Sequence, residues 1–124
     1  MIMPPAPDNL PDHLRELMPL TPAVFFILFA LADGEKHGYA IMQDVSSLSD
    51  KNVHMGPGTL YTTIQRLLDL HLIQQTATKS RADARRVYYR LTRPGKSLLE
   101  AETARLRTLV RLAQKKRMAL RNAH

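Results

Sequence analysis

Apolar residues recur at helical spacing in the stretch from Gly56 to Leu70. They occupy positions i, i+4, i+7 and i+8 and are Leu60, Ile64, Leu67 and Leu68. This spacing places all of them on one stripe of an α-helix. Pro57 suits the first position of such a helix, because proline lacks the N–H group that would be unpaired there. The pattern therefore predicts a helix that begins near Pro57 and turns its apolar stripe toward a core.

The opposite face of this helix carries polar side chains of moderate length. They are Thr59, Tyr61, Thr62, Gln65 and Arg66. Hydroxyl, amide and guanidinium groups contact base edges and phosphates in DNA complexes, and Gly58 leaves the helix N-terminus open to the close approach of a phosphate. The same pattern also fits a core-packing helix with a solvated polar face. The elements around the helix bear on the choice between these two interpretations.

Two apolar patterns precede this helix. After a proline-rich stretch of residues 1–7, which we expect to be disordered, helical spacing predicts a short amphipathic helix from Asp8 to Met18. A second helix begins at Thr21-Pro22, a cap followed by proline. It is apolar nearly all round from Val24 to Ala32, as expected of a helix surrounded by protein. Its phenylalanines are assigned to core or subunit contacts, with a ligand-stacking cluster as the alternative: Phe25, Phe26 and Phe29.

A helix-turn-helix layout follows. His37-Gly38-Tyr39 opens a third helix, whose apolar residues keep helical spacing up to the polar, irregular stretch from Ser49 to Met55. The helix from Pro57 comes next. Two short helices joined by a tight linker, the second bearing a polar face, form the layout of helix-turn-helix DNA-binding proteins.

After Leu70 the period of the apolar residues changes from about 3.6 to about 2, which indicates strands. Leu72-Ile73 begins one strand, and apolar and polar residues alternate from Val87 to Leu91 in a second. The polar, basic segment of residues 79–86 joins them as a hairpin loop. A two-stranded hairpin is marginally stable alone, so we expect it to lean on the helices and to project its tip as a wing beside the predicted DNA-contacting helix.

A long last helix is predicted from Thr92, which can cap it, to about Leu120. Its apolar positions line one side: Leu99, Leu106, Leu109, Val110 and Ala113. That side is too long for a small domain to cover, whereas the same helix of a second copy would cover it in a twofold dimer. The alternative is a helix that folds back across its own domain.

Positive charge gathers in the second half of the chain. The 124 residues hold 18 Lys and Arg against 11 Asp and Glu, a formal net charge of +7. The stretch from Lys79 to Lys96 holds seven basic residues and a single acidic one, Asp83. No Asp or Glu follows Glu102. This balance favours a polyanionic partner such as double-stranded DNA.

Length and composition argue against several other functions. The chain suits one domain, and its lack of cysteine excludes disulfides and thiolate metal sites. The histidines show no metal-ligand spacing and no catalytic constellation is found, so we expect no enzyme activity, no metal and no cofactor. The start lacks a signal-peptide pattern, and the most apolar run, Leu20 to Ala32, is shorter than the roughly 20 residues that span a bilayer. We therefore expect a soluble, cytoplasmic protein that does not enter membranes.

Several short motifs occur together in a specific order. They are Leu20-Thr21-Pro22, His37-Gly38-Tyr39, Gly56 to Tyr61, Leu72-Ile73, and Arg86 to Thr92 with Gly95. In this order and spacing the chain resembles the PadR family of winged-helix transcriptional regulators, in its compact subgroup with a single C-terminal dimerisation helix. The resemblance implies a dimeric repressor that binds a near-palindromic operator and, in many members, leaves it on binding a small aromatic or drug-like effector. Because the chain has no tryptophan, an effector pocket built on indole stacking is not expected.

The predicted fold is mainly α with a small β-hairpin (α+β), a winged helix-turn-helix with a long C-terminal dimerisation helix. We divide it into a proline-rich arm with a short helix (1–19), a DNA-binding winged helix-turn-helix (20–92) and a dimerisation helix (93–124). The predicted function is sequence-specific transcription regulation by a twofold dimer on a palindromic operator, as a repressor released by a small-molecule effector. The alternative is a winged-helix adaptor that binds a protein partner; a small-molecule-binding enzyme or scavenger has only the phenylalanine cluster in its favour.

DNA contacts are predicted for three groups of residues. Major-groove candidates, for which plain solvent exposure is the alternative, are Thr59, Thr62, Gln65 and Arg66. Phosphate candidates are Tyr39, Gly58 and Tyr61, with core packing as the alternative for Tyr39. Wing candidates are Lys79, Arg81, Arg85 and Arg86, with bracing of the hairpin as the alternative for Arg86. An effector is expected between Phe25, Phe26 and Phe29 and the last helix of the partner.

Overall fold

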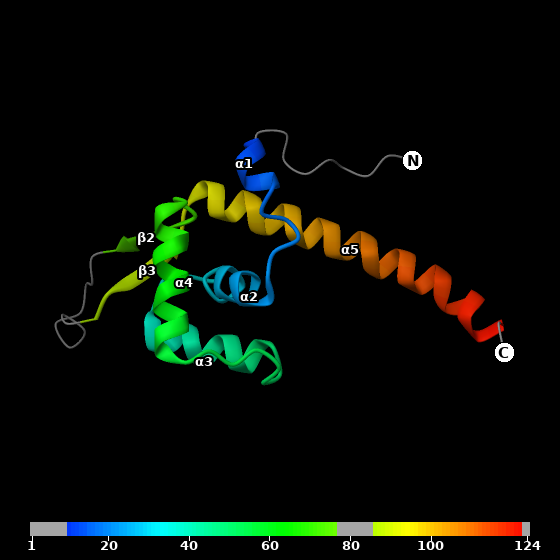
Figure 1. Ribbon diagram of the computed structural model, residues 1–124, viewed down its shortest axis with the longest axis horizontal. Coiled ribbons are helices and arrows are strands. Elements are labelled where there is room, and N and C mark those ends of the chain that lie inside the picture. Colours follow the sequence, from blue (N-terminus) through cyan, green and yellow to red (C-terminus); the bar gives the residue numbers. More distant parts are fainter. Residues whose placement is uncertain (1–9, 77–85, 123–124) are drawn as a thin grey trace.

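The computed structural model describes residues 10–76 and 86–122. In chain order its elements are α1 (Asp12–Arg15), α2 (Pro22–Ala30), β1 (Lys36–His37), α3 (Gly38–Leu48), α4 (Pro57–Asp69), β2 (Ile73–Thr76), β3 (Tyr88–Leu91) and α5 (Arg93–Asn122). We call the part from α1 to β3 the head. Figure 1 shows the helices of the head gathered together, the strands at one edge, and α5 projecting far beyond the head. The predicted mainly α fold with a small sheet and a long last helix is confirmed.

Side chains cap the starts of α2, α3 and α5. Thr21 Oγ1 accepts a hydrogen bond from the backbone N–H three residues later (3.3 Å), and Thr92 Oγ1 accepts one from the Gly95 N–H (3.1 Å). His37 Nδ1 accepts one from the Ala40 N–H (3.2 Å). These bonds satisfy N–H groups that the start of a helix leaves without partners. The predicted starts at Thr21, His37 and Thr92 are therefore confirmed.

The apolar stripe of α4 lies at the centre of the core. Leu60, Ile64 and Leu67 are buried, and Leu68 is partly buried. They share this core with buried side chains of α2, α3, the sheet and α5, including Ile27, Leu28, Ile41, Val45, Ile73 and Leu98. Full burial of one such side chain is worth about 1.5–3 kcal/mol, so the stripe fixes the rotation of α4 about its axis. The prediction that this stripe faces a core is confirmed.

The first helix is shorter than predicted. The sequence predicts a helix from Asp8 to Met18, whereas α1 covers only Asp12–Arg15; residues 1–9, including the stretch expected to be disordered, lie outside the described part. The two residues before Pro19 donate their N–H groups to carbonyls three residues back. Such bonds form a 3₁₀ turn, which is common at the end of an α-helix. Pro19 itself disfavours helical backbone at the residue before it. The apolar side chains around α1 nevertheless pack on the core.

Within the described residues, the sheet has three strands and not the predicted two. β3 lies in the middle, antiparallel to β2 on one side and to β1 on the other. Ile73 pairs with Leu91 between β2 and β3, as the predicted hairpin requires, while Lys36 of β1 pairs with Tyr89. A strand of two residues is too short to show an alternating pattern, so the sequence predicts none there. Of the predicted loop, residues 79–86, all but Arg86 lie outside the described part of the chain.

The first turns of α5 belong to the core, and the later turns do not. Leu98, Leu99 and Ala101 are buried, whereas residues 109–117 are exposed. Leu99 is one of the residues predicted to lie on a dimer face, and the structure places it inside its own chain, because the start of α5 packs against α2. The projecting part of α5 therefore begins after the first three turns of the helix.

Glu102 joins α5 to the segment before α2. Only 2% of its surface is exposed. Its Oε2 accepts a hydrogen bond from the Leu20 N–H (2.8 Å), and Arg105 donates to both carboxylate oxygens (2.5 and 3.0 Å). The hydrogen bonds from Arg105, with a smaller contribution from Leu20, hold the pKa of Glu102 below its ordinary value, although burial alone would raise it. A buried carboxylate with such partners stays charged at neutral pH.

We expect acid to weaken the fold partly through Glu102. A carboxyl group whose pKa is lower in the folded state contributes stability above its unfolded pKa and loses this contribution as pH falls through the folded value. Between about pH 5 and pH 3 the urea midpoint should fall more in the wild type than in Glu102→Gln. At pH 7 the charged Glu102 should contribute about 1–2 kcal/mol to the free energy of unfolding. The value is modest because Arg105 is partly exposed, so that water weakens its bonds to the carboxylate. Glu100→Gln, at an exposed position of the same helix, is the control; a wild-type to Glu102→Gln difference that stays constant with pH would contradict the assignment.

Candidate nucleic-acid interface

The turn between α3 and α4 presents α4 on the outside of the head. Ser49 is buried, and its Oγ accepts a hydrogen bond from the Val53 N–H (2.9 Å). Asp50 and Lys51 adopt left-handed backbone conformations, with φ of 52° and 64°, which let the chain reverse within a few residues. The buried hydroxyl thus fixes a tight linker between the two helices, as the helix-turn-helix prediction requires.

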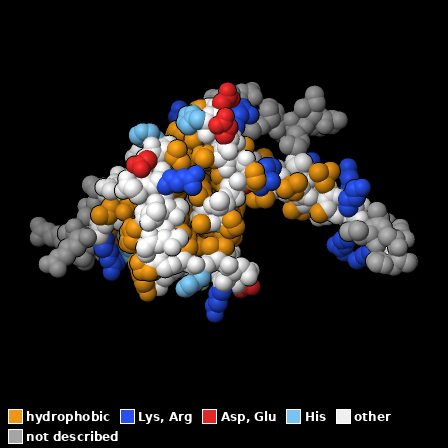
Figure 2. Space-filling view, viewed as in Figure 1, with side chains coloured by type: hydrophobic (Ala, Val, Ile, Leu, Met, Phe, Trp, Pro, Cys, Tyr) orange, Lys and Arg blue, Asp and Glu red, His pale blue; other side chains and the backbone are white. Residues whose placement is uncertain are grey.

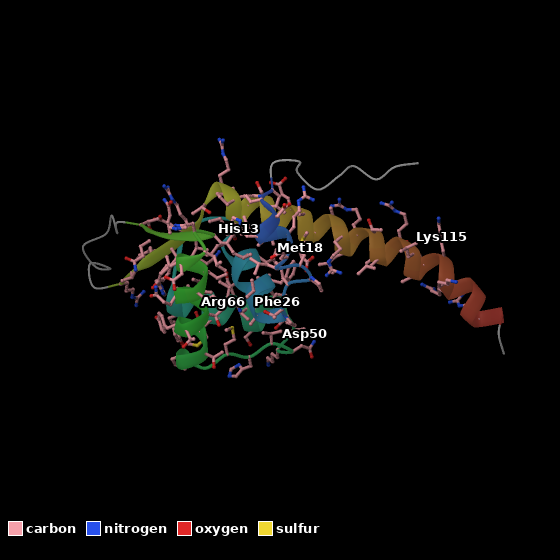
Figure 3. All side chains as sticks on the ribbon, turned by 45° about the horizontal axis from the view of Figure 1, so that its top comes forward. His13, Met18, Phe26, Asp50, Arg66 and Lys115 are labelled. Atoms are coloured by element: carbon pink, nitrogen blue, oxygen red, sulfur yellow. The ribbon has the colours of Figure 1, made fainter. Side chains whose placement is uncertain are left out.

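The polar face of α4 points to solvent. Each of its predicted DNA-contacting residues is exposed: Gly58, Thr59, Tyr61, Thr62, Gln65 and Arg66. A methyl group added at Gly58 would meet no atom within 4 Å, so the N-terminus of α4 is open to close approach. Figure 3 shows Arg66 on α4, away from the projecting part of α5. The structure therefore leaves this face available to a macromolecular partner, as its periodicity predicts.

A shallow depression follows this face toward the C-terminal end of α4. It has a volume of about 490 Å³ and is lined by Tyr61, Thr62, Gln65, Arg66 and Asp69. Gln65 Nε2 donates a hydrogen bond to Asp69 Oδ1 (3.0 Å). This bond orients the Gln65 amide, and Asp69 adds a carboxylate that can accept a hydrogen bond from a cytosine amino group. Asp69 was not among the predicted contact residues, although its i, i+4 spacing from Gln65 indicates such a pair.

Tyr61 leans on the N-terminus of α3. A Cβ atom at Gly38 would lie 2.3 Å from Tyr61 Oη, so the tyrosine ring occupies the space that the missing side chain leaves. About half of Tyr61 (49%) and of Tyr39 (58%) is exposed. The position of Tyr61 beside the apolar stripe predicts that its ring leans on the head. In the structure the hydroxyl end of the ring makes the contact with Gly38.

His37 and Arg86 join this surface to the base of the wing. Arg86 Nη1 lies 3.0 Å from His37 Nε2, and the His37 ring packs edge-on against Tyr88, with centroids 5.4 Å apart. A second depression of about 300 Å³ lies here, lined by His37, Gly38, Tyr39, Tyr61, Arg86, Val87 and Tyr89. The structure thus brings together three predicted phosphate or wing residues, Tyr39, Tyr61 and Arg86, from α3, α4 and the segment just before β3.

His37, which both caps α3 and contacts Arg86, was not among the predicted site residues. Its partner lies 49 positions later in the chain, and only the position of His37 just before a helix start pointed to the cap. The other wing candidates, Lys79, Arg81 and Arg85, lie outside the described residues.

The phenylalanines of α2 form a small aromatic cluster. Phe25 packs edge-on against Phe26, with centroids 5.3 Å apart, and stacks on Phe29 at 5.5 Å. Phe25 and Phe26 are partly buried against the core, while 43% of Phe29 is exposed. The cluster is therefore partly core and partly surface.

The projecting part of α5 carries exposed apolar side chains. Leu109, Val110 and Leu112 are about half exposed, Ala113 is exposed and Leu106 is partly buried. Figure 2 shows hydrophobic and basic side chains along this arm, which stands clear of the head, and Lys115 lies on it (Figure 3). Leu112 was not among the residues predicted for a dimer face.

The described residues offer neither a cluster of metal ligands nor a membrane-spanning helix. In residues 10–76 and 86–122, His, Asp and Glu do not gather in groups of three that could hold a metal ion. Over the same part of the chain, no helix combines the length and the apolar character needed to cross a membrane.

Comparison with known proteins identifies relatives in sequence and in structure. The model of the transcriptional regulator PadR-like family matches residues 27–101. The chain is 38% identical over 80 residues to a 37.1 kDa protein of transposon TN4556 from Streptomyces fradiae, and the match covers 64% of this chain but only 21% of that protein. The chain thus spans about a fifth of this relative.

Solved structures of low sequence identity share the fold. One is a PadR family transcription regulator from Clostridium difficile R20291, with a TM-score of 0.64 and 24% identity over 77% of this chain and 97% of the other. Another is Bacillus subtilis PadR in complex with operator DNA, with a TM-score of 0.57 and 24% identity over 66% of this chain and 45% of the other. The family match extends over more than half of the chain, which confirms the resemblance seen in the sequence: this chain belongs to the PadR-like family of transcriptional regulators.

Proposed function

We propose that this protein binds double-stranded DNA sequence-specifically, as a twofold dimer on a palindromic operator, and represses transcription. The observation that carries the proposal is one continuous polar surface formed by the outer face of α4 and the depression between Tyr39, Tyr61 and Arg86. The first part offers groups suited to base edges and the second offers groups suited to phosphates. The net charge of +7 favours a polyanionic partner for this surface.

Each part of the surface has a proposed role. Base edges in the major groove would be read by Thr59, Thr62, Gln65 and Arg66. Phosphates would be held by Tyr39, Tyr61, the open N-terminus of α4 at Gly58, and Arg86 at the base of the wing. Lys79, Arg81 and Arg85 would extend these contacts along the wing. Phosphate contacts supply affinity, and base contacts supply the choice of sequence.

Dimerisation is proposed for the projecting part of α5. Apolar residues that recur on one side of the helix support an interface there: partly buried Leu106 and exposed Leu109, Val110 and Ala113. In a twofold dimer the two α4 helices would enter successive major grooves about 34–36 Å apart, one turn of DNA.

We expect Leu109→Glu to separate the proposed dimer. A carboxylate buried in an apolar helix interface lacks partners, so the dimer dissociation constant should rise about 100-fold or more. Sedimentation velocity over a concentration series measures this change. Arg111→Gln is a matched control, because it alters the net charge equally at an exposed position about 200° around the helix from position 109. A Leu109→Glu protein that remains dimeric at wild-type concentrations would contradict the interface.

An aromatic or drug-like effector is proposed to bind between the α2 phenylalanines and α5 of the partner. The partly exposed stack of Phe25 and Phe29 supports this placement. A ligand there would favour one spacing of the two heads over another and so change the affinity for the operator. Identical operator footprints of free and ligand-saturated protein would remove the proposal for the ligand tested.

The function is tested with the DNA that flanks the protein's own gene. We expect a footprint with twofold symmetry, an affinity roughly 10³-fold or more above that for scrambled DNA, and a steep loss of affinity as salt rises. Equal affinity for scrambled DNA would contradict sequence-specific regulation. Full function after Arg81→Ala and Arg85→Ala would instead favour the adaptor that binds a protein partner.

A further inference from the structure

The junction between the head and α5 is formed by two kinds of contact with different consequences. Leu98, Leu99 and Ala101 pack in the core, and such apolar contacts are not directional. Glu102 differs, because its buried carboxylate accepts hydrogen bonds from the Leu20 N–H and from Arg105 at 2.5–3.0 Å. Hydrogen bonds depend on angle as well as distance, so this carboxylate restrains how α5 lies against the head.

Because of the position of Glu102 in α5, a small change of angle there causes a large displacement at the far end of the helix. Leu20 directly precedes Thr21, the cap of α2, so the bond from Leu20 ties α5 to the start of a core helix. Beyond Glu102, α5 continues to Asn122, a length of about 30 Å at 1.5 Å per residue. A tilt of about 10° at Glu102 would displace the far end by about 5 Å, which exceeds the rise of one DNA base pair.

We infer that Glu102 is a positioning residue that sets the separation of the two heads and thereby selects the spacing of the operator half-sites. This inference rests on the proposed function, since it assumes that the projecting part of α5 forms the dimer. In the dimer, each head meets DNA at a distance fixed by its junction with α5. A looser junction leaves the surface of α4 intact and changes only how well the two heads match one spacing.

Glu102→Gln tests this inference with little change of volume. The bond from the Leu20 N–H to a neutral amide oxygen is weaker than the bond to a carboxylate, and the bonds from Arg105 that orient the side chain are lost, so the restraint between α5 and the head is loosened. The binding substrate is a set of DNA duplexes that carry two identical half-sites separated by spacers of increasing length. Wild-type protein should prefer one spacer. In Glu102→Gln the optimum should move by about one base pair, or the preference should fall about 10-fold, while the affinity for a duplex with a single half-site stays at the wild-type value.

A second measurement follows the heads without DNA. The chain has no cysteine, so Ser47→Cys, at an exposed position of α3, places one spin label on each head. The distance between the two labels of a dimer, measured by double electron–electron resonance spectroscopy, should be narrowly distributed in the wild-type background. In Glu102→Gln it should broaden or shift by several ångströms. Glu100→Gln removes an exposed carboxylate from the same helix and should change neither the distance nor the spacer preference.

The possible outcomes separate this inference from the proposed function. A folded Glu102→Gln dimer with the wild-type spacer preference and label distance overturns the inference, even if its melting temperature is lower. If Glu102→Gln fails to fold, Arg105→Gln decides by the same measurements, because it removes the two hydrogen bonds that orient the Glu102 carboxylate toward the Leu20 N–H. A wild-type protein without a dimer or without any spacer preference would refute the proposed function itself.

Discussion

Replacing Arg66 by alanine is expected to weaken operator binding about 5- to 150-fold, which corresponds to the roughly 1–3 kcal/mol of one bidentate base contact. Arg66 is exposed on the outer face of α4, and the buried stripe of Leu60, Ile64 and Leu67 on the other face keeps this helix from rotating. The side chain of Arg66 therefore stays on the outer face of the helix, where we propose that it pairs with a guanine edge. Fluorescence anisotropy with the operator and with scrambled DNA, at several salt concentrations, measures the loss.

Two further variants separate base recognition from general attraction to phosphates. Arg66→Lys keeps the charge and loses the planar fork of donors, so it should lose most of the specificity and little of the non-specific affinity. Arg107→Ala removes one charge from an exposed position of α5, outside the proposed DNA surface, and should change both affinities slightly. Equal losses in Arg66→Ala and Arg107→Ala would show that Arg66 contributes only charge.

The parts of the fold that could be predicted depend on patterns within one helix or strand. The stripe of α4 and the caps at Thr21 and Thr92 each involve residues that are close in the sequence. The structure has all three as predicted. The outer face of α4 follows from the same periodicity, because burial of one face determines which side chains remain outside. This is why the major-groove candidates could be proposed before the structure.

The features that escaped prediction join residues far apart in the chain. Strand β1 exists because Lys36 pairs with Tyr89, and His37 meets Arg86 at the same edge of the sheet. Glu102 is buried because Leu20, 82 positions earlier, donates to it, whereas its sequence surroundings resemble an ordinary solvated helix. Periodicity reports only which face of an element is buried, so pairings between elements must come from the structure.

The same reasoning explains the unequal success within the candidate site. The exposure of Gln65 and Arg66 follows from the periodicity of α4 alone. The contact of Tyr61 with Gly38 depends on how α3 and α4 pack together. The family motif that contains Gly38 could be recognised in the sequence, but its physical reason could not. In the structure a Cβ atom at this position would require the hydroxyl end of Tyr61 to move.

We expect Gly95→Ala to destabilise the protein by about 3 kcal/mol or more, the upper range for overpacking a buried site. A Cβ atom at Gly95 would lie 2.0 Å from the carbonyl oxygen of Leu72. That oxygen already accepts a hydrogen bond from the Thr92 N–H (3.1 Å), so it cannot move away without breaking the start of α5. The start of α5 would therefore have to move away from Leu72. Urea unfolding followed by circular dichroism measures the loss.

Gly58→Ala is the matched control for Gly95→Ala, because both glycines lie in the first turn of a helix. A Cβ atom at Gly58 meets nothing within 4 Å, and alanine loses less conformational entropy than glycine on folding, so stability should rise by up to about 1 kcal/mol. Its operator affinity should nevertheless fall, since the added methyl group stands where a phosphate is proposed to approach the N-terminus of α4. If Gly95→Ala and Gly58→Ala unfold at the same urea concentration, the close packing of α5 against Leu72 is refuted. If Gly58→Ala binds the operator as the wild type does, the phosphate does not approach there.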